Sequence, residues 1–423
     1  MDDPAPRPGV PASPFQAAIA ILLVSVAVRL ALLQFVPLNP AWTMRWETAK
    51  VASQLLQTGE YANPYILPSG PTAHAVPFHT ALMLAIFALF GTGMGAEYAR
   101  CGVTMLSFSA MYALMPWFGL KLGLGLRAGF IGGLIGALNP LHFQTGISGG
   151  IGEEFAGISM GLLMAASLAA WQAPGWIGTR WLLLGCAWGA ACHVSPVLLT
   201  VLVAFVLFDL LRGGARSKWG QLVLLAAGAV LVCAPWTYRN YKALNGFVFI
   251  RSNFGLELRM GNHPGVAATM DQTDRSRPGL HPTTHREEAL KVAELGELAY
   301  MRRSRDEALN WIAANPGEFA RFTASRFLHL WFGSPEDPFS MIVTTLLTIL
   351  ALIGARRAWP ILATPQRAAV FLPLLSFPAI YYFLAYMPRY RIPVDWILML
   401  LAGYAVSDWI RRREAPGGDC DIL

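Results

Sequence analysis

Residues 15–36 read FQAAIAILLVSVAVRLALLQFV, an apolar run of 22 residues that only Gln16, Ser25, Arg29 and Gln34 interrupt. A helix needs about 20 apolar residues to cross the hydrocarbon core of a bilayer. The run is too long for the core of a signal peptide, and no small-x-small cleavage site follows it. The sequence therefore predicts an uncleaved first membrane-spanning helix.

Further apolar blocks of similar length follow along the 423-residue chain, of which 55% is hydrophobic and only 13% charged. Soluble domains carry about 25% charged residues, so an ordinary soluble protein is excluded. Residues 181–211 are too long for one span and are broken at His193-Val-Ser-Pro196, which predicts a hairpin of two short helices. Other spans are expected near residues 99–120, 128–146, 154–171, 220–237, 340–355, 366–386 and 394–410. The predicted fold class is an all-α polytopic membrane protein.

The net charge of +7 is explained by topology and does not indicate a nucleic-acid partner. Residues 77–90 are apolar but only about 21 Å long as a helix, which favours a helix at the membrane surface. If this helix does not cross, one side of the membrane receives the loop residues Lys121, Arg127, Arg180, Arg212, Arg216, Lys218, Arg356, Arg357, Arg367 and Arg411–Arg413. The positive-inside rule makes that side cytoplasmic, together with both termini.

This topology divides the chain into five parts. They are a cytoplasmic tail (1–14), an N-terminal transmembrane core (15–238) with an outer loop (37–98), an extracytoplasmic segment (239–339), C-terminal transmembrane helices (340–410) and a second tail (411–423). We expect juxtamembrane helices in the outer loop and a small mixed structure in the outer segment. Basic residues alternate with aromatic ones in 317–332, a pattern typical of an interfacial helix.

The predicted outer face gathers charged residues from distant parts of the chain. They are Glu47, the pair Glu153-Glu154, Arg239, Lys242, Arg389 and Arg391. A carboxylate can take a proton from a hydroxyl, and guanidinium groups can hold a phosphate. Each residue also has a simpler interpretation, as a solvated loop residue, a helix N-terminal charge or an interfacial anchor. His74, His79 and His142 are candidates for a metal site, although their spacing matches no zinc motif.

Several motifs occur together in a characteristic order. Arg29 lies in the first helix, and the chain continues with RWETAKVASQLL (45–56), GPTAHAVP (70–77), APWTYRN (234–240), RSNFGLEL (251–258), GN (261–262) and RYRIP (389–393). In this order the chain resembles the GT-C membrane glycosyltransferases, in the branch of bacterial protein mannosyltransferases and the lipid A aminoarabinose transferase. The likeness extends from about residue 15 to 410 and implies a GT-C transmembrane helix bundle.

The resemblance implies transfer of a hexosyl or pentosyl group, with inversion, from a polyprenyl-phosphate donor to a hydroxyl of a lipid, glycan or protein. It places this reaction on the extracytoplasmic face of a bacterial inner membrane. Glu47 corresponds to the proposed general base, although the family more often has Asp there, with a second acid where Trp46 stands. Glu154 would assist by binding acceptor or metal, and a divalent metal is compatible with the family. Substrate-binding roles are implied for Arg45, His74, His79, Arg239, Lys242, Arg389 and Arg391.

Two other functions remain open from the sequence. A flippase or transporter of lipids or polysaccharide precursors would share the multispan body and the basic outer ring, and a scaffold would bind no donor. Ionisable residues deep in the membrane are few, mainly Arg29, whereas a proton-coupled carrier normally needs more. The phosphate-binding loop GxxxxGK[ST] is also absent from the sequence, so ATP-driven transport has no support.

Overall fold

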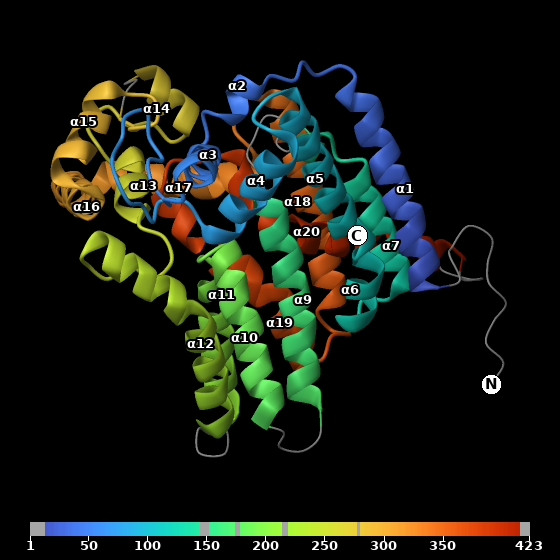
Figure 1. The fold of residues 1–423 in the computed structure, drawn as a ribbon. Coiled ribbons are helices and arrows are strands. Elements are labelled where there is room, and N and C mark those ends of the chain that lie inside the picture. Colours follow the sequence, from blue (N-terminus) through green and yellow to red (C-terminus); the bar gives the residue numbers. More distant parts are fainter. Residues whose placement is uncertain (1–12, 144–151, 174–177, 214–218, 277–279, 415–423) are drawn as a thin grey trace.

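The computed structural model describes residues 13–143, 152–173, 178–213, 219–276 and 280–414. These residues form helices joined by loops (Figure 1), and the described part of the chain has isolated β-bridges but no named strand. The predicted all-α class is confirmed. The loop between α7 and α9 falls partly outside the described residues, as does part of the predicted span 128–146.

Five helical stretches are long and apolar enough to cross a membrane. They are α1 (Pro14–Leu33), α5 with α6 (Met94–Ala113 and Met115–Lys121), α9 (Glu153–Gln172), α12 (Trp219–Leu244) and α18 (Pro338–Ala358). The bundle also contains α7 (Leu126–Ala137), α10 (Gly178–Val194), α11 (Leu198–Gly213), α19 (Thr364–Ser376) and α20 (Ile392–Glu414). The chain is therefore a polytopic helical membrane protein.

Prolines lie where two of the predicted membrane segments are interrupted. The break between α10 and α11 lies at Ser195-Pro196, as predicted. The predicted span 366–386 is wrong in length, because α19 ends at Ser376. Pro378 begins a short 3₁₀ helix, η2 (Pro378–Phe383), instead. Pro378 has no N–H to donate, so the α-helical hydrogen bonds of α19 cannot continue through it.

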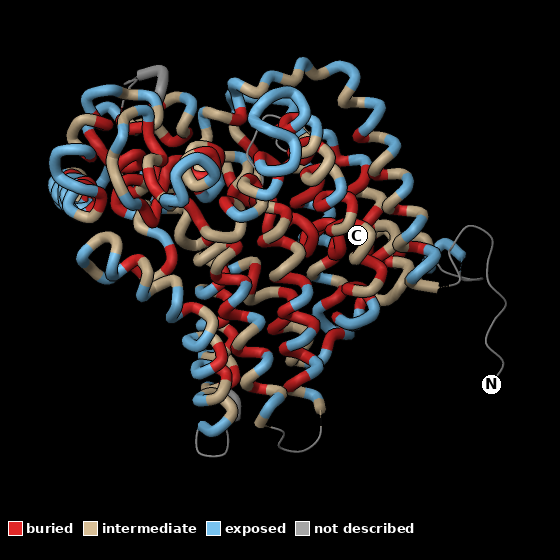
Figure 2. The backbone as a smooth tube through the Cα atoms, viewed as in Figure 1, coloured by how far each residue is buried: buried red, intermediate tan, exposed pale blue. Residues whose placement is uncertain are grey.

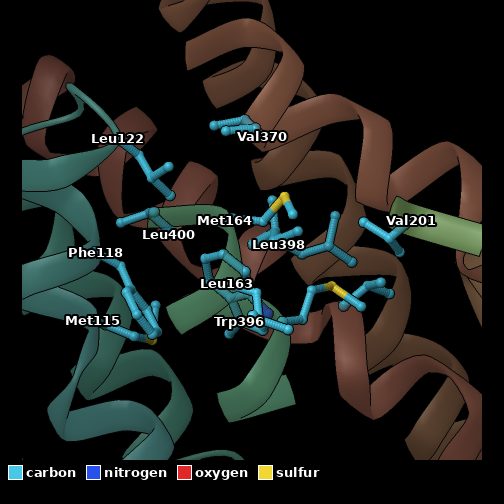
Figure 3. Close-up of a cluster of buried hydrophobic side chains, with 14 of the residues drawn as sticks. Met115, Phe118, Leu122, Leu163, Met164, Val201, Val370, Trp396, Leu398 and Leu400 are labelled. Atoms are coloured by element: carbon cyan, nitrogen blue, oxygen red, sulfur yellow. The ribbon is translucent and has the colours of Figure 1, made fainter. Parts of the chain in front are cut away.

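The core of the bundle forms where α6, α9 and α20 meet. The rings of Phe118 and Trp396 have centroids 4.9 Å apart, and Met164 is buried in the same cluster (Figure 3). A side chain at Gly403 would collide with the backbone of Ala128, so small residues let α20 approach α7 closely. Figure 2 shows the buried residues concentrated in this central region, with exposed faces on α1 and α12.

The outer loop carries α2 (Pro40–Thr43), α3 (Glu47–Thr58) and α4 (Pro77–Phe90). Gly59 ends α3 in the left-handed conformation, with φ of +76°, which glycine adopts without a steric penalty. Proline at the first position begins α4 and Gly91 follows its last residue, so its bounds are those predicted. Leu89 and Phe90 are exposed, consistent with a helix end in contact with lipid.

The outer segment is helical in its described residues. It comprises α13 (Phe254–Gly261), α14 (Met270–Ser276), α15 (Arg286–Leu295), α16 (Glu297–Ala314) and α17 (Pro316–Phe332), and a 3₁₀ helix η3 (Pro388–Arg391) precedes α20. Arg259 joins α13 to α15 through a 2.9 Å ion pair with Glu288, which also accepts a hydrogen bond from the Tyr300 hydroxyl. Figure 1 shows this segment at the same end of the bundle as α2, α3 and α4.

Candidate active site

Glu47 begins α3 at the point where the outer loop meets the outer segment. The N-terminal end of a helix favours a negative charge. Burial alone would raise the pKa of the Glu47 carboxyl, but His74, His281, the backbone N–H of Glu47 and Arg251 outweigh burial, so the pKa lies below its usual value. Glu47 is therefore an ionised carboxylate at neutral pH, and its side chain is 19% exposed.

Two imidazole rings face the same oxygen of Glu47. Nε2 of His74 lies 3.8 Å from Oε1 of Glu47, and Nε2 of His281 lies 3.7 Å from it. The Tyr65 hydroxyl lies 3.0 Å from Nδ1 of His74, and the Thr283 hydroxyl lies 2.6 Å from Nδ1 of His281. Burial lowers the pKa of His74 to about 3, although the charge of Glu47 acts in the opposite direction.

Glu47, His74 and His281 have the spacing and chemistry of metal ligands. Their nitrogen–oxygen distances exceed the ~3.2 Å limit of an N–H···O hydrogen bond. Two ligands of one tetrahedral zinc ion are about 3.3 Å apart, given bonds of about 2.0–2.1 Å. One ligand atom from each residue lies within 4.8 Å of the others. Two imidazoles and a carboxylate form a common catalytic zinc site, which keeps one position open. The three residues therefore have the spacing of a zinc site, and binding would require the ring proton of His281 to lie on Nδ1, facing the Thr283 hydroxyl, instead of on Nε2.

We expect the purified protein to bind Zn²⁺ and the variant His281→Ala to bind it at least about tenfold more weakly, since it loses one of three ligands. Titration calorimetry after removal of metal with a chelator measures this affinity. His285→Ala is the matched control, because it removes an imidazole from the same segment four residues away. Equal affinity in His281→Ala and the wild type would contradict the assignment.

Glu297 fixes the loop that carries His74. Its buried carboxylate accepts hydrogen bonds from the backbone N–H of Ala73 at 2.8 Å, from the hydroxyl of Ser252 at 2.7 Å and from the hydroxyl of Thr72. Burial raises the pKa of Glu297, and these donors act against that rise. The outer loop and the outer segment are thus joined next to His74.

Two arginines complete this attachment. Arg239 donates hydrogen bonds to the carbonyl oxygens of Thr72 at 2.6 Å and Tyr61 at 2.8 Å. Nε of Arg251 donates to the carbonyl oxygen of His74. Arg239 was predicted to bind substrate, but its guanidinium group holds the outer loop. The charge of Arg251 lowers the pKa of both Glu47 and His74.

Arg389 brings a positive charge to the same region. Its Nε lies 3.3 Å from Oε1 of Glu153, and its guanidinium group lies 5.4 Å from the centroid of the Trp46 ring. Burial would lower the pKa of Arg389, but Glu153, Tyr390, Glu257 and Glu47 raise it above its usual value. The Arg389 side chain is 27% exposed. Arg389 is thus a charged guanidinium next to Trp46, the residue that precedes Glu47.

Other predicted site residues make contacts with residues outside the group formed by Glu47, His74 and His281. Arg45 and Lys242 are exposed, and the Lys242 ammonium lies 5.7 Å from the Tyr238 ring centroid. Glu154 is buried and accepts a 3.1 Å hydrogen bond from the Ser107 hydroxyl, between α5 and α9. The ring of His79 packs against Gly152. Their proposed roles in the reaction stay predictions.

Arg391 points into the bundle and forms part of a buried polar chain. Its Nε donates to Asp395 at 2.5 Å, and the other carboxylate oxygen of Asp395 lies 2.7 Å from Nε2 of His142. The Tyr112 hydroxyl lies 2.6 Å from Nδ1 of His142 and 3.4 Å from the guanidinium group of Arg29. His142 is therefore committed to this chain and does not join His74 in a metal site.

Sequence reasoning did not identify His281 and Arg251 as site residues. Arg251 begins the RSNFGLEL motif, which was a usable signal. His281 lies in a segment rich in Pro and Thr, and no spacing connects it with His74, 207 positions earlier. Only the attachment of the outer loop to the outer segment brings the two rings within 5.9 Å of each other, centroid to centroid.

No protein-family model and no curated protein sequence matches the chain. Among solved structures, it is similar to the Archaeoglobus fulgidus oligosaccharyltransferase in the apo form, with a TM-score of 0.55. It is also similar to the archaeal oligosaccharyltransferase AglB from the same organism, in complex with an inhibitory peptide and a dolichol-phosphate, with a TM-score of 0.58. Each pair is 13% identical and covers 97% of this chain and 52% of the other.

ArnT from Cupriavidus metallidurans bound to undecaprenyl phosphate also aligns, at 13% identity over 93% of this chain and 77% of its own, with a TM-score of 0.36. This chain spans about half the length of the archaeal oligosaccharyltransferase. The oligosaccharyltransferase is a GT-C membrane glycosyltransferase, and its similarity extends over nearly all of this chain. The fold of the chain is therefore the GT-C fold, as the sequence resemblance implied.

Proposed function

We propose that the protein is a glycosyltransferase that moves a sugar from a polyprenyl-phosphate donor to an acceptor hydroxyl on the outer face of the membrane. The observation that carries this proposal is the ionised Glu47 carboxylate, which faces two imidazoles and has the charged Arg389 nearby. These residues come from three distant parts of a chain with a GT-C fold. A carboxylate, imidazoles and a guanidinium group are the groups that transfer from a lipid phosphate would need.

In the proposed reaction, Glu47 accepts the proton of the acceptor hydroxyl while the hydroxyl oxygen attacks the anomeric carbon. The bond between that carbon and the phosphate oxygen breaks, so the configuration inverts and the lipid phosphate leaves with the bonding electrons. A carboxylate with a low pKa is a weak base, so its main contribution is to orient the hydroxyl and receive its proton late in the step.

Arg389 would stabilise the negative charge of the departing phosphate, because its guanidinium group is partly exposed and can form paired hydrogen bonds with phosphate oxygens. Arg391 and Arg239 are less suited to this role, since their hydrogen bonds hold Asp395 and the outer loop. A zinc ion held by His74, His281 and Oε1 of Glu47 would supply a Lewis acid, and Oε2 of Glu47 would be the oxygen left to receive the proton.

Exposed apolar side chains on α4 and α17 suit a lipid-linked substrate. Leu89 and Phe90 at the end of α4 are 77% and 54% exposed, and Phe327 and Leu328 on α17 are 44% and 52% exposed. An isoprenoid tail can lie against such side chains while its phosphate meets basic groups at the membrane surface. The archaeal oligosaccharyltransferase of similar fold was solved with a dolichol-phosphate, which supports a polyprenyl-linked donor.

The donor sugar would be a hexose or a pentose, and the acceptor a lipid, glycan or protein hydroxyl. We propose that the enzyme lies in a bacterial inner membrane, as the family resemblance implies. The basic loops at the opposite side support a site on the periplasmic face.

The test supplies the full-length protein in nanodiscs with undecaprenyl-phosphate sugars carrying a radiolabel in the sugar. Membrane lipids, glycans and proteins serve as acceptors. We expect release of undecaprenyl phosphate together with a labelled acceptor. Movement of intact labelled lipid between leaflets of proteoliposomes, without bond cleavage, would instead identify a flippase. Absence of donor binding would identify a scaffold, and either result overturns the proposal.

A further inference from the structure

Helices α10 and α12 pack with their backbones in contact at three glycines. A side chain at Gly185 would collide with the carbonyl oxygen of Leu225, and one at Gly228 would collide with the carbonyl oxygen of Leu182. One turn further, a side chain at Gly189 would lie 2.8 Å from the carbonyl oxygen of Ala229. Small residues spaced four apart permit such backbone contact between membrane helices.

The same alignment brings two cysteines together. Gly185 pairs with Leu225 and Gly228, and Gly189 pairs with Ala229, so both helices run in the same direction. Continuing this register by one turn places Cys192 opposite Cys233. These two residues belong to one buried cluster, with exposed fractions of 2% and 3%. Sγ of Cys233 also donates to the carbonyl oxygen of Gly189 at 3.5 Å.

Close backbone approach is the condition that a disulfide requires. Its two Cα atoms must lie about 4.4–6.8 Å apart. The glycines at 185, 189 and 228 let the backbones of α10 and α12 come into direct contact. We propose that Cys192 and Cys233 form a redox-active pair, which an oxidant of the disulfide or diazene class converts to an intrachain disulfide.

The oxidation is balanced within this pair and its oxidant. Each thiol gives up its hydrogen, one S–S bond forms, and two electrons and two protons pass to the oxidant, which is reduced to two thiols or to a hydrazine. A thiol reductant reverses the reaction by exchange. The proposal is independent of the transferase function.

The disulfide would strengthen the attachment of α12. Among the five apolar span helices, α12 has the smallest share of its apolar stretch buried, and its principal contacts are with α10 (Figure 1). The cluster that holds the two thiols also contains Ile250, the residue before Arg251. Because Arg251 donates to the carbonyl oxygen of His74, a covalent link at Cys192 would fix the helix end that leads to the site.

The test compares the purified full-length protein after treatment with diamide and after treatment with a thiol reductant. Both samples are unfolded in detergent and alkylated with a maleimide that adds a visible mass. The sequence has five cysteines, so reduced protein should gain five labels and oxidised protein three. Peptide mapping should find Cys192 joined to Cys233. We also expect the oxidised protein to unfold a few degrees higher, with the increase abolished by reductant.

Cys192→Ser and Cys233→Ser should each gain four labels whether or not diamide is added. Cys186→Ser is the matched control on the same helix, and it should still lose two labels on oxidation. The proposal is overturned if oxidised wild type gains five labels, if Cys192→Ser still loses two, or if the link joins two chains. Wild-type peptide mapping gives this answer without relying on the folding of any variant.

Discussion

Glu47→Gln is expected to lower the rate of sugar transfer by about 10²–10⁴-fold while leaving the fold intact. Glutamine has nearly the shape of glutamate but cannot accept the acceptor proton as a carboxylate does. Because the pKa of Glu47 lies below its usual value, the wild-type residue is ionised across the neutral range, so the loss should be similar from pH 6 to pH 8. Release of labelled undecaprenyl phosphate in the presence of acceptor measures the rate.

Glu60→Gln is the matched control, because Glu60 lies in the same outer loop and is exposed. It should retain wild-type activity. Thermal unfolding of Glu47→Gln should stay within a few degrees of the wild type, which separates a chemical defect from misfolding. Full transfer activity in Glu47→Gln would show that this carboxylate takes no part in the reaction, even if it positions His74 and His281.

The sequence predicted those parts of the fold that neighbouring residues determine. Proline at residue 77 and glycine at residue 91 are local signals for the start and end of a helix, and α4 has the predicted bounds. The break at Ser195-Pro196 is equally local. The predicted span 366–386 was wrong because the prediction followed the apolar composition and did not allow for Pro378. In the structure α19 ends at Ser376 and a 3₁₀ helix begins at Pro378.

The candidate site was only partly predictable, because tertiary contacts assemble it. Glu47 and His74 lie in one loop, and the family resemblance pointed to both. His281 comes from a different segment, which Glu297 attaches to the loop through Thr72 and Ala73. No pattern in the sequence indicates that attachment.

Arg389 and Arg391 show a further limit of sequence reasoning. Both were expected to bind the phosphate, yet they are two residues apart in the 3₁₀ helix η3, which has about three residues per turn. Their side chains therefore leave the helix in different directions. Arg389 lies over the Trp46 ring near Glu47, whereas Arg391 is buried against Asp395.

Asp395→Asn tests what Arg391 does. Asp395 and Arg391 are 6% and 5% exposed, so removing the carboxylate leaves a buried guanidinium group without its counter-ion. Breaking a buried ion pair in this way costs about 3–5 kcal/mol. We expect a large fall in the thermal unfolding midpoint in detergent. Asp408→Asn, at the other end of α20, should cost no more than about 1 kcal/mol, because Asp408 pairs with partly exposed arginines.

The double variant Arg391→Met with Asp395→Asn should recover most of this loss. Methionine removes the unpaired charge, and asparagine still offers His142 a hydrogen-bond partner in place of the carboxylate oxygen 2.7 Å away. If Arg391 serves only to pair with Asp395 and to cap the carbonyl oxygen of Trp331, the recovered protein should transfer sugar at nearly the wild-type rate. A double variant that is stable but inactive would instead indicate that Arg391 binds the substrate. Stability and sugar transfer would then depend on different contacts of the Arg391 guanidinium group.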